Sequence, residues 1–373
     1  MDNVGRIEKA ELYVIKLPLV SPFSTAYGVV KERESLLLKL TSDGCSGWGE
    51  CVAFRDPWYN YETIDTSLHI VTKYLIPELF QIDNMTVDQF PDLFKWIKGH
   101  NMSKAMVENA LLDLYARKNS VPLYDILGGT KKKIRSGISI GIVDGPDMLL
   151  SEIDKAVRKN YHRIKVKIRR GMDLNIFSEI RKIFPKINLS VDANGDFTEN
   201  DIGILKKFDE FDLMMIEQPF TSDNFLAHAK FQEQIKTPVC LDESIDSINA
   251  AVNAVNLKSC RVICIKQGRV GGMVKAKELS EFCIDNNIDI WSGGMLETGI
   301  GRSFNLHLQT LDGFGSPGDT SESSRFFIED IVIEPVTLDR KGFIDIPDGS
   351  GTGIEVRTEM IEKFKIFNRT MIK

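Results

Sequence analysis

The stretch YHRIKVKIRRGMDLNIFSEIRKIFPKINLSVDAN, residues 161–194, decides the fold expected for this chain. It contains two short apolar segments, residues 162–168 and 187–194, separated by a stretch with helical spacing. Each apolar segment carries a charged residue near its end, Lys167 in the first and Asp192 in the second. A strand, a helix and a second strand in turn indicate parallel pairing, with strands covered on both faces.

The same unit repeats along the chain from about residue 134. The strand candidates share a short apolar run, and they are residues 136–142, 162–168, 187–194, 213–219, 237–244, 261–267 and 288–294. Seven or more such units that close on themselves form a TIM-type barrel. A doubly wound sheet, the competing α/β fold, would favour a glycine-rich phosphate turn of the GxGxxG type after its first strand, and this sequence has none there.

Two other regions have different patterns. Residues 8–53 read as strands, with a turn signal at Ser42–Gly44, and residues 62–120 read as helices. Sheet followed by helices predicts an α+β domain over residues 1–125, before a barrel over residues 126–325. The alternation stops after about residue 325, and we expect residues 326–373 to return to the first domain.

The composition excludes several classes of partner. The formal net charge is −6, whereas a nucleic-acid-binding surface is basic. No stretch approaches the roughly 18 apolar residues of a membrane span, and the first 20 residues mix charges into their apolar residues, unlike a signal peptide. The six cysteines form no CxxC pair, which is typical of reduced thiols. We therefore expect a cytoplasmic protein that binds neither nucleic acid nor membrane.

Charged residues recur with nearly constant spacing at the ends of five successive strand candidates. The positions are Lys167, Asp192, Glu217, Asp242 and Lys266, at intervals of 25, 25, 25 and 24 residues, and Trp291 follows after a further 25. This spacing places each side chain at the same point of the next unit, where the carboxyl ends of barrel strands form the catalytic face. A single Asp after a strand is usually a turn or capping residue. Lysines inside apolar strands are harder to explain in that way, because a buried lysine needs a partner.

The three acids of this series predict a metal site. Asp192, Glu217 and Asp242 offer hard oxygen ligands from neighbouring strands, the donors that Mg²⁺ prefers. The five histidines lie outside the series, which argues against zinc. A Mg²⁺ ion on a substrate carboxylate can stabilise the enediolate that forms when the α-proton leaves.

The lysines are candidates for the base that removes that proton. A base must be neutral near pH 7, whereas the usual pKa of lysine is about 10.4. Lys165 and Lys167 lie two residues apart on a strand and therefore on the same inward face. Burial and a nearby cation lower a lysine pKa, so we expect Lys165 to act on Lys167, and Arg269 to act on Lys266. The two lysines at the ends of the series would approach the substrate from opposite faces.

At these positions the chain resembles the enolase superfamily, in its muconate-lactonizing subgroup. The matching motifs are Lys165-Val166-Lys167, VDAN at 191–194, IEQP at 216–219, LDES at 241–244 and IKQGRVGG at 265–272. The resemblance implies a capping domain over a (β/α)₇β barrel, with Mg²⁺, or alternatively Mn²⁺, held by the three acids, and with Lys167 and Lys266 as acid/base residues. Asn194 is expected to support the metal ligands. Gln267 departs from the pattern, because many relatives have proline after the lysine, and the loop is expected to differ slightly.

Within the subgroup, residues 17–34, 49–63, 139–142 and 292–302 resemble o-succinylbenzoate synthases and N-acylamino acid racemases. We expect specificity to lie in the cap and in the barrel loops. The candidate substrate contacts are Ser24 to Tyr27, Phe54, Tyr59, Ser139, Gly294 and Met295. The resemblance also implies a small-molecule carboxylate as the substrate, and we expect a homo-oligomer.

Residues alone do not choose between two reactions. In a synthase, Lys167 removes the α-proton of a succinyl-cyclohexadiene carboxylate and helps the β-hydroxyl leave as water, on the path to menaquinone. In a racemase of N-acyl amino acids, such as N-succinyl ones, one lysine removes the proton and the other returns one. The resemblance favours the synthase, with the racemase as the alternative. A barrel that only binds a ligand is a remote third hypothesis, because unused buried charges destabilise a protein.

Overall fold

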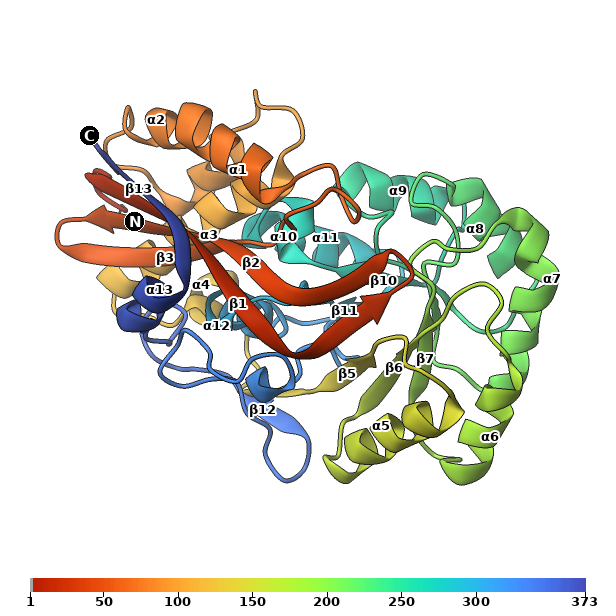
Figure 1. Ribbon diagram of the computed structural model, residues 1–373. Coiled ribbons are helices and arrows are strands. Elements are labelled where there is room, and N and C mark those ends of the chain that lie inside the picture. The colour runs from red at the N-terminus through yellow and green to blue at the C-terminus, as the bar shows by residue number, and fades with distance from the viewer. Residues whose placement is uncertain (1–2) are drawn as a thin grey trace.

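The computed structural model describes residues 3–373 and places them in two lobes, a capping domain and a barrel (Figure 1). Four antiparallel strands form the capping sheet, in the order β13-β1-β2-β3. Their bounds are Lys365–Ile372 for β13, Lys9–Thr25 for β1, Gly28–Ser42 for β2 and Cys45–Cys51 for β3. The β1–β2 hairpin reaches the barrel, where the N–H of Ile142 donates to the carbonyl of Ser24 at 2.9 Å.

The helices of the capping domain pack on this sheet. They are α1 (Ile64–Ile70), the π-helical turn η1 (Val71–Leu75), α2 (Ile76–Leu79), the 3₁₀ helix η2 (Val87–Asp92), α3 (Asn101–Lys118) and α4 (Leu123–Leu127). Helix α3 crosses β3 at Gly47 and Gly49, where a Cβ atom would lie 2.3 Å and 2.1 Å from backbone oxygens of the helix. Glycine is therefore required at both positions for helix and strand to approach so closely.

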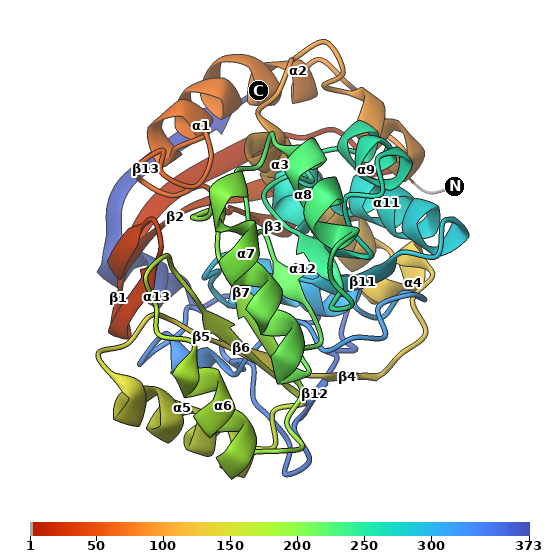
Figure 2. The same cartoon turned by 90° about the vertical axis from the view of Figure 1, so that its right-hand side faces the viewer.

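Seven parallel strands form the barrel sheet, and each neighbours the next in sequence. They are β5 (Gly137–Ile140), β6 (Arg163–Lys167), β7 (Leu189–Asp192), β8 (Ile216–Glu217), β9 (Val239–Leu241), β10 (Val262–Ile265) and β11 (Asp289–Ser292). The connecting helices lie around them (Figure 2), namely α5 (Pro146–Arg158), α6 (Asn175–Ile183), η3 (Glu199–Asp201), α7 (Ile202–Leu205), η4 (Lys206–Phe211), α8 (Phe225–Gln232), α9 (Ile248–Asn256), α10 (Gln267–Val270), α11 (Met273–Asp285) and α12 (Gly299–Leu308).

A short segment around Gly318 closes the barrel between its first and last strands. Gly318 forms a parallel bridge with Ser136, and its carbonyl accepts the N–H of Gly137 at 2.7 Å. On the other side, the N–H of Asp319 donates to the carbonyl of Ser292 at 3.0 Å. The eighth strand of the predicted TIM-type barrel is thus reduced to a single bridge.

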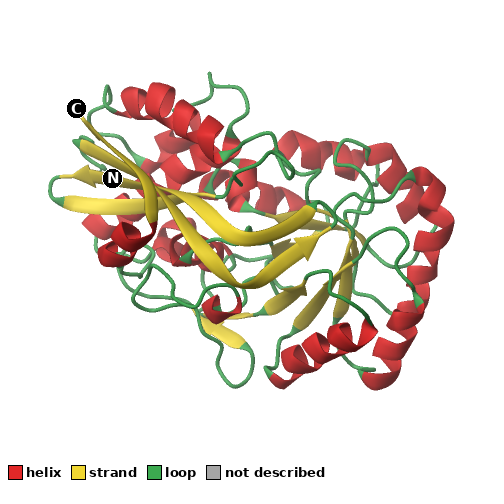
Figure 3. Ribbon diagram, viewed as in Figure 1, coloured by secondary structure: helices red, strands yellow, loops and turns green. Residues whose placement is uncertain are grey.

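The C-terminal region contacts both lobes. After η5 (Ser323–Arg325), strand β12 (Phe343–Asp345) pairs with β4 (Lys133–Arg135), and α13 (Thr358–Phe364) leads into β13 beside β1. Figure 3 shows the long β1–β2 hairpin running from the capping sheet towards the barrel strands. None of the helices between residues 3 and 373 combines the length and the apolar character that crossing a membrane requires.

Buried carboxylates of the capping domain join it to the barrel. Glu50 of β3 accepts N–H groups of Thr298 and Gly301 at the start of α12, at 3.1 Å and 2.9 Å. Glu108 of α3 accepts the N–H of Val274 at the start of α11, at 2.9 Å. Both carboxylates satisfy N–H groups that lack partners within their helix.

Glu108 is expected to make stability depend on pH. Burial raises the pKa of Glu108 to about 7, above the unfolded value near 4.3. The folded state therefore binds the extra proton between these values, and the stability that Glu108 contributes is lost as the pH rises towards 7. Across that window the loss corresponds to about 3 kcal/mol. We expect Glu108→Gln to gain stability relative to the unsubstituted protein between about pH 5 and pH 8, as measured by urea unfolding. A constant difference between the two proteins would contradict this account.

Candidate active site

The charged residues of the regular series gather at one end of the barrel. Lys167, Asp192 and Glu217 end strands β6, β7 and β8 and are paired side by side in the sheet. Asp242 and Lys266 directly follow β9 and β10. All five side chains are buried. The constant spacing along the chain thus becomes a row of neighbours in space.

The first flank of this row is built by the two lysines of β6. The Lys167 Nζ lies 2.5 Å from Oδ2 of Asp192 and donates to Oδ1 of Asn194 at 2.7 Å. The Lys165 Nζ lies 2.9 Å from Oε2 of Glu217 and 3.2 Å from Oδ2 of Asp192. Both lysines therefore face into the barrel, and Asp192 is shared between them.

The opposite flank is built around Lys266. Its Nζ lies 2.8 Å from Oδ2 of Asp242, 3.1 Å from the Tyr59 hydroxyl and 3.5 Å from Sδ of Met295. The Arg269 guanidinium contacts the same Asp242 carboxylate and lies 3.0 Å from the Tyr59 oxygen. Arg269 is 2% exposed, so it belongs to the site and not to the solvent.

A largely buried acid beyond the series, Asp319, completes the environment of Lys165. Its two oxygens lie 2.6 Å from the Lys165 Nζ and 2.6 Å from Nη2 of Arg163. The Arg163 guanidinium lies 3.9 Å from the centre of the Trp291 ring, a cation–π contact. Arg163 and Trp291 are fully buried. Lys165 is thus held by three carboxylates at a fixed point inside the barrel.

These ion pairs set the protonation of the lysines. Burial acts to lower the pKa of Lys165 and of Lys266, but the facing carboxylates, led by Asp319 and by Asp242 respectively, raise both pKa values well above 10.5. Arg269 lowers the pKa of Lys266, as expected from the sequence, but Asp242 outweighs this effect and keeps Lys266 protonated in this arrangement. A divalent cation beside Asp242 would compete for the same negative charge, and the local pKa pattern would change.

The pKa values of Asp192 and Glu217 are shifted in opposite directions. Burial opposes ionisation of Asp192, but Lys167 and Lys165 outweigh it and lower the pKa of Asp192 to about 2. Burial and the adjacent Asp192 charge raise the pKa of Glu217 well above its usual range. A cation bound beside Glu217 would favour the charged form of this carboxylate and so oppose the rise in its pKa.

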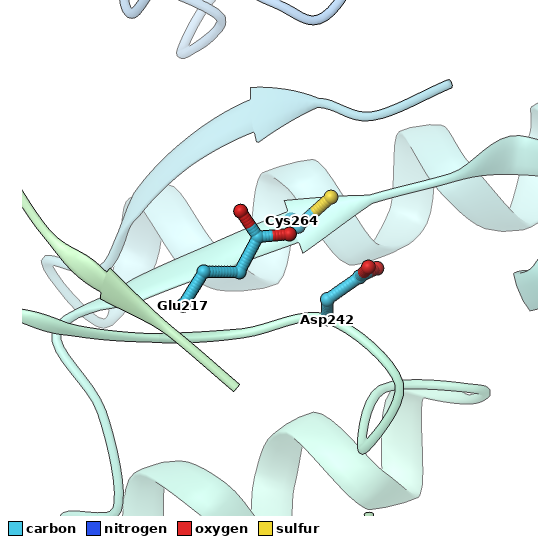
Figure 4. Close-up of side chains that lie close together, drawn as sticks. All are labelled: Glu217, Asp242 and Cys264. Atoms are coloured by element: carbon cyan, nitrogen blue, oxygen red, sulfur yellow. The ribbon is translucent and has the colours of Figure 1, made fainter. Parts of the chain in front are cut away.

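The donor set fits a divalent cation. Oxygens of Glu217 and Asp242 and the Sγ of Cys264 all lie within 4.8 Å of one another (Figure 4). Cys264 was not predicted as a ligand, and burial raises the pKa of its thiol well above 9.0, so it stays protonated and binds metal weakly. Among the residues that the structure describes, Asp192 is not part of this group, although its Oδ2 and Oε2 of Glu217 both contact the Lys165 Nζ. Three carboxylates match the preference of Mg²⁺ and Mn²⁺ for oxygen.

A cavity beside Lys167 and Lys266 extends under the capping domain. Its lining comprises Phe23, Thr25, Tyr27, Val30, Phe54, Trp58, Tyr59, Ser139, Lys165, Lys167, Asn194, Lys266, Gly294, Met295, Leu296, Glu297, Arg302, Asp319 and Phe326. The candidate contacts Tyr59, Ser139, Gly294 and Met295 all lie on this lining. The Ser139 hydroxyl is buried and has no hydrogen-bond partner within residues 3–373, so it is available to a polar ligand. A larger groove between α5 and α6 also borders Lys167, but none of the three acids lines it.

Sequence reasoning missed two acids of the site. Asp319 lies 28 residues beyond Trp291, close to where the next position of the series falls, and this spacing was the signal available. Glu243 follows Asp242 directly and accepts the Asn194 amide at 2.8 Å. Asn194 thus contacts both Lys167 and Glu243. It also lies two residues after Asp192, a candidate metal ligand.

Fold and site together define the class of protein. Residues 9–128 match the family described as mandelate racemase / muconate lactonizing enzyme, N-terminal domain, and residues 148–360 match the enolase C-terminal domain-like family. The chain belongs to this branch of the enolase superfamily, whose enzymes typically use a divalent metal.

Particular relatives are similar over nearly the whole chain. The o-succinylbenzoate synthase of Geobacillus kaustophilus is 42% identical over 369 residues, which is 98% of each protein. The N-succinylamino acid racemase of Thermus thermophilus is 36% identical over 366 residues, covering 98% of this chain and 99% of that protein. The crystal structure of an enolase-superfamily member from Listeria innocua superposes with a TM-score of 0.95 at 38% identity and covers 99% of both chains.

Proposed function

We propose that this protein is a Mg²⁺-dependent enzyme that catalyses the o-succinylbenzoate synthase reaction. The observation that carries the proposal is the row of three buried carboxylates with Lys167 and Lys266 on opposite flanks. The substrate is a cyclohexadiene carboxylate that carries a succinyl arm and a β-hydroxyl group. The similarity to o-succinylbenzoate synthases over 98% of the chain supports this substrate.

The chain's own residues suffice to describe the proton transfers. The Lys167 amine takes the α-proton, and the electron pair of the C–H bond moves into the enediolate. The C–O bond of the β-hydroxyl group then breaks, and the hydroxyl takes a proton from the Lys167 ammonium and leaves as water. The ring becomes aromatic and Lys167 returns to its neutral form. Lys266 stays protonated and stabilises the enediolate from the other face.

A cation held by Asp192, Glu217 and Asp242 would supply Lewis-acid stabilisation to the developing carboxylate charge. We infer Mg²⁺ as this ion, since all three donors are carboxylates. The six free cysteines support a reducing, cytoplasmic location.

Racemisation of N-succinylamino acids is a second candidate function, and one observation favours it. Lys266, like Lys167, is buried and held in place by other residues of the site, through contacts to Asp242, Tyr59 and Met295. A two-base racemase needs such a second lysine, because one amine removes the α-proton and the opposite ammonium returns a proton to the other face. The similarity to the racemase of Thermus thermophilus supports the same reaction.

Turnover with both substrates tests the proposal. We expect dehydration of the succinyl-cyclohexadiene carboxylate with Mg²⁺ present, and loss of that activity when EDTA is added. The racemisation of an N-succinylamino acid is followed in parallel by optical rotation. A larger kcat/KM for racemisation would assign the second function, and absence of both activities with Mg²⁺ would leave only a ligand-binding barrel.

A further inference from the structure

The segment that follows Lys266 is attached to the capping domain by a pair of buried amides. The Asn109 side chain of α3 donates through Nδ2 to Oε1 of Gln267 at 3.0 Å. Asn109 is fully buried and Gln267 is 1% exposed. Gln267 is the residue directly after Lys266 in the chain, so the contact lies next to the proposed acid/base residue.

Close packing around this amide pair leaves the segment little freedom. A Cβ atom at Gly268 would lie 2.5 Å from the Val52 side chain of the capping domain, and one at Gly272 would lie 2.2 Å from the Glu108 carboxylate. The Lys266 carbonyl accepts the N–H groups of Arg269 and Val270, at 3.0 Å and 3.1 Å. The Lys266 backbone therefore moves with helix α10, and α10 is seated on α3.

The amide pair uses only part of its hydrogen-bonding capacity. Gln267 Nε2 and Asn109 Oδ1 are both buried and have no partner among the residues that the structure describes. The one hydrogen bond between the amides is thus the polar link that they share. An apolar residue at either position would remove this link and leave the remaining amide without a partner, at a cost.

Lys167 and Lys266 differ in their contacts with the capping domain. The polar contacts recorded for Lys167 come from barrel residues, Asp192 and Asn194. Lys266 contacts Tyr59 of the capping domain directly, and its neighbour Gln267 contacts Asn109. A shift of the capping domain relative to the barrel is therefore expected to displace Lys266 more than Lys167.

We propose that Asn109 and Gln267 are positioning residues through which the capping domain sets Lys266, and with it proton transfer at one face of the substrate. The inference rests on the proposed function, since it assumes that Lys266 and Lys167 act on opposite faces. It adds that the cap–barrel contact controls one of the two proton transfers and leaves the other largely unaffected.

Exchange of the α-proton in D₂O, measured for each enantiomer of an N-succinylamino acid, tests this role. We expect Asn109→Leu and Gln267→Leu to lower kcat for exchange of the enantiomer served by Lys266 by about 10- to 100-fold, since a misplacement near 1 Å costs up to about 100-fold. For the enantiomer served by Lys167, kcat for exchange should change by less than about threefold. KM should be nearly constant for both enantiomers. The double variant should be no slower than the slower single variant, because both remove one contact.

Two further variants separate positioning from general damage. The swapped variant, Asn109→Gln with Gln267→Asn, keeps a pair of amides at this contact. It is expected to restore α-proton exchange towards the rate of the unsubstituted protein. Asn101→Ala removes another α3–barrel hydrogen bond, from Asn101 Nδ2 to the carbonyl of Asp246 at 2.9 Å, and should leave the ratio between enantiomers unchanged.

The outcomes distinguish the two levels of the proposal. Equal losses for both enantiomers in the Asn109 and Gln267 variants would overturn the positioning role while leaving the proposed function intact. If the leucine variants fail to fold, Asn109→Ala provides the same comparison with a smaller change in volume. Absence of exchange by the unsubstituted protein would overturn the proposed function and the positioning role with it.

Discussion

Lys167→Ala is expected to lower kcat for dehydration and for racemisation by about 10⁴-fold, the upper range for loss of a general acid–base group. The Lys167 amine is needed twice in dehydration, as the base for the α-proton and as the acid for the departing hydroxyl. Its Nζ lies within hydrogen-bond distance of Asp192 and Asn194, so its position is fixed from both sides. The steady-state rate with each substrate, at saturating Mg²⁺, measures the loss.

Lys104→Ala is the matched control for this experiment. Lys104 is also a buried lysine, but it lies in the capping domain and donates to the carbonyl of Ile97. Its removal is expected to affect stability and to leave turnover per folded molecule unchanged. Retention of more than about a tenth of the activity by Lys167→Ala would show that another group takes the α-proton.

Glu217→Gln is expected to weaken Mg²⁺ binding by at least about 100-fold and to lower turnover by about 10³-fold. The amide has nearly the shape of the carboxylate but carries no charge, so packing in the barrel is retained. Glu217 lies between the other two acids of the row, and its oxygens approach those of Asp242 within 4.8 Å. Calorimetric titration with MgCl₂ measures the affinity of each protein.

Glu108→Gln provides the control for charge removal. It neutralises an equally buried carboxylate, but one that caps helix α11 away from the row. Mg²⁺ affinity should therefore match that of the unsubstituted protein. If the Glu217 and Glu108 variants bind Mg²⁺ equally well, the metal site lies elsewhere.

The regular part of the site could be predicted because a barrel repeats. Each strand–helix unit takes about 25 residues, so Lys167, Asp192, Glu217, Asp242 and Lys266 lie at nearly equal intervals in sequence and on neighbouring strands in space. The predicted TIM-type barrel follows from the same alternation, the capping domain was predicted from strands followed by helices, and both agree with the structure. The pleat of β6 likewise predicted that Lys165 and Lys167 share the inward face.

The irregular parts could not be predicted in this way. The eighth strand is a single bridge at Gly318 within the sequence GFGSPGD, which has no apolar run to mark it, and Asp319 was missed with it. The burial of Arg269 and its contacts with Asp242 and Tyr59 depend on packing between segments distant in sequence. The direction of the Lys266 pKa shift depends on a distance of 2.8 Å to Asp242, which spacing along the chain does not give.

The most direct test of the central claim, that two lysines serve opposite faces of one site, is α-proton exchange by Lys266→Ala in D₂O. Each enantiomer of an N-succinylamino acid is incubated separately with the variant and Mg²⁺, and deuterium incorporation is followed by NMR. The account predicts that exchange from one enantiomer is lost while Lys167 continues to exchange the other. Equal residual rates from both enantiomers would contradict the two-lysine arrangement.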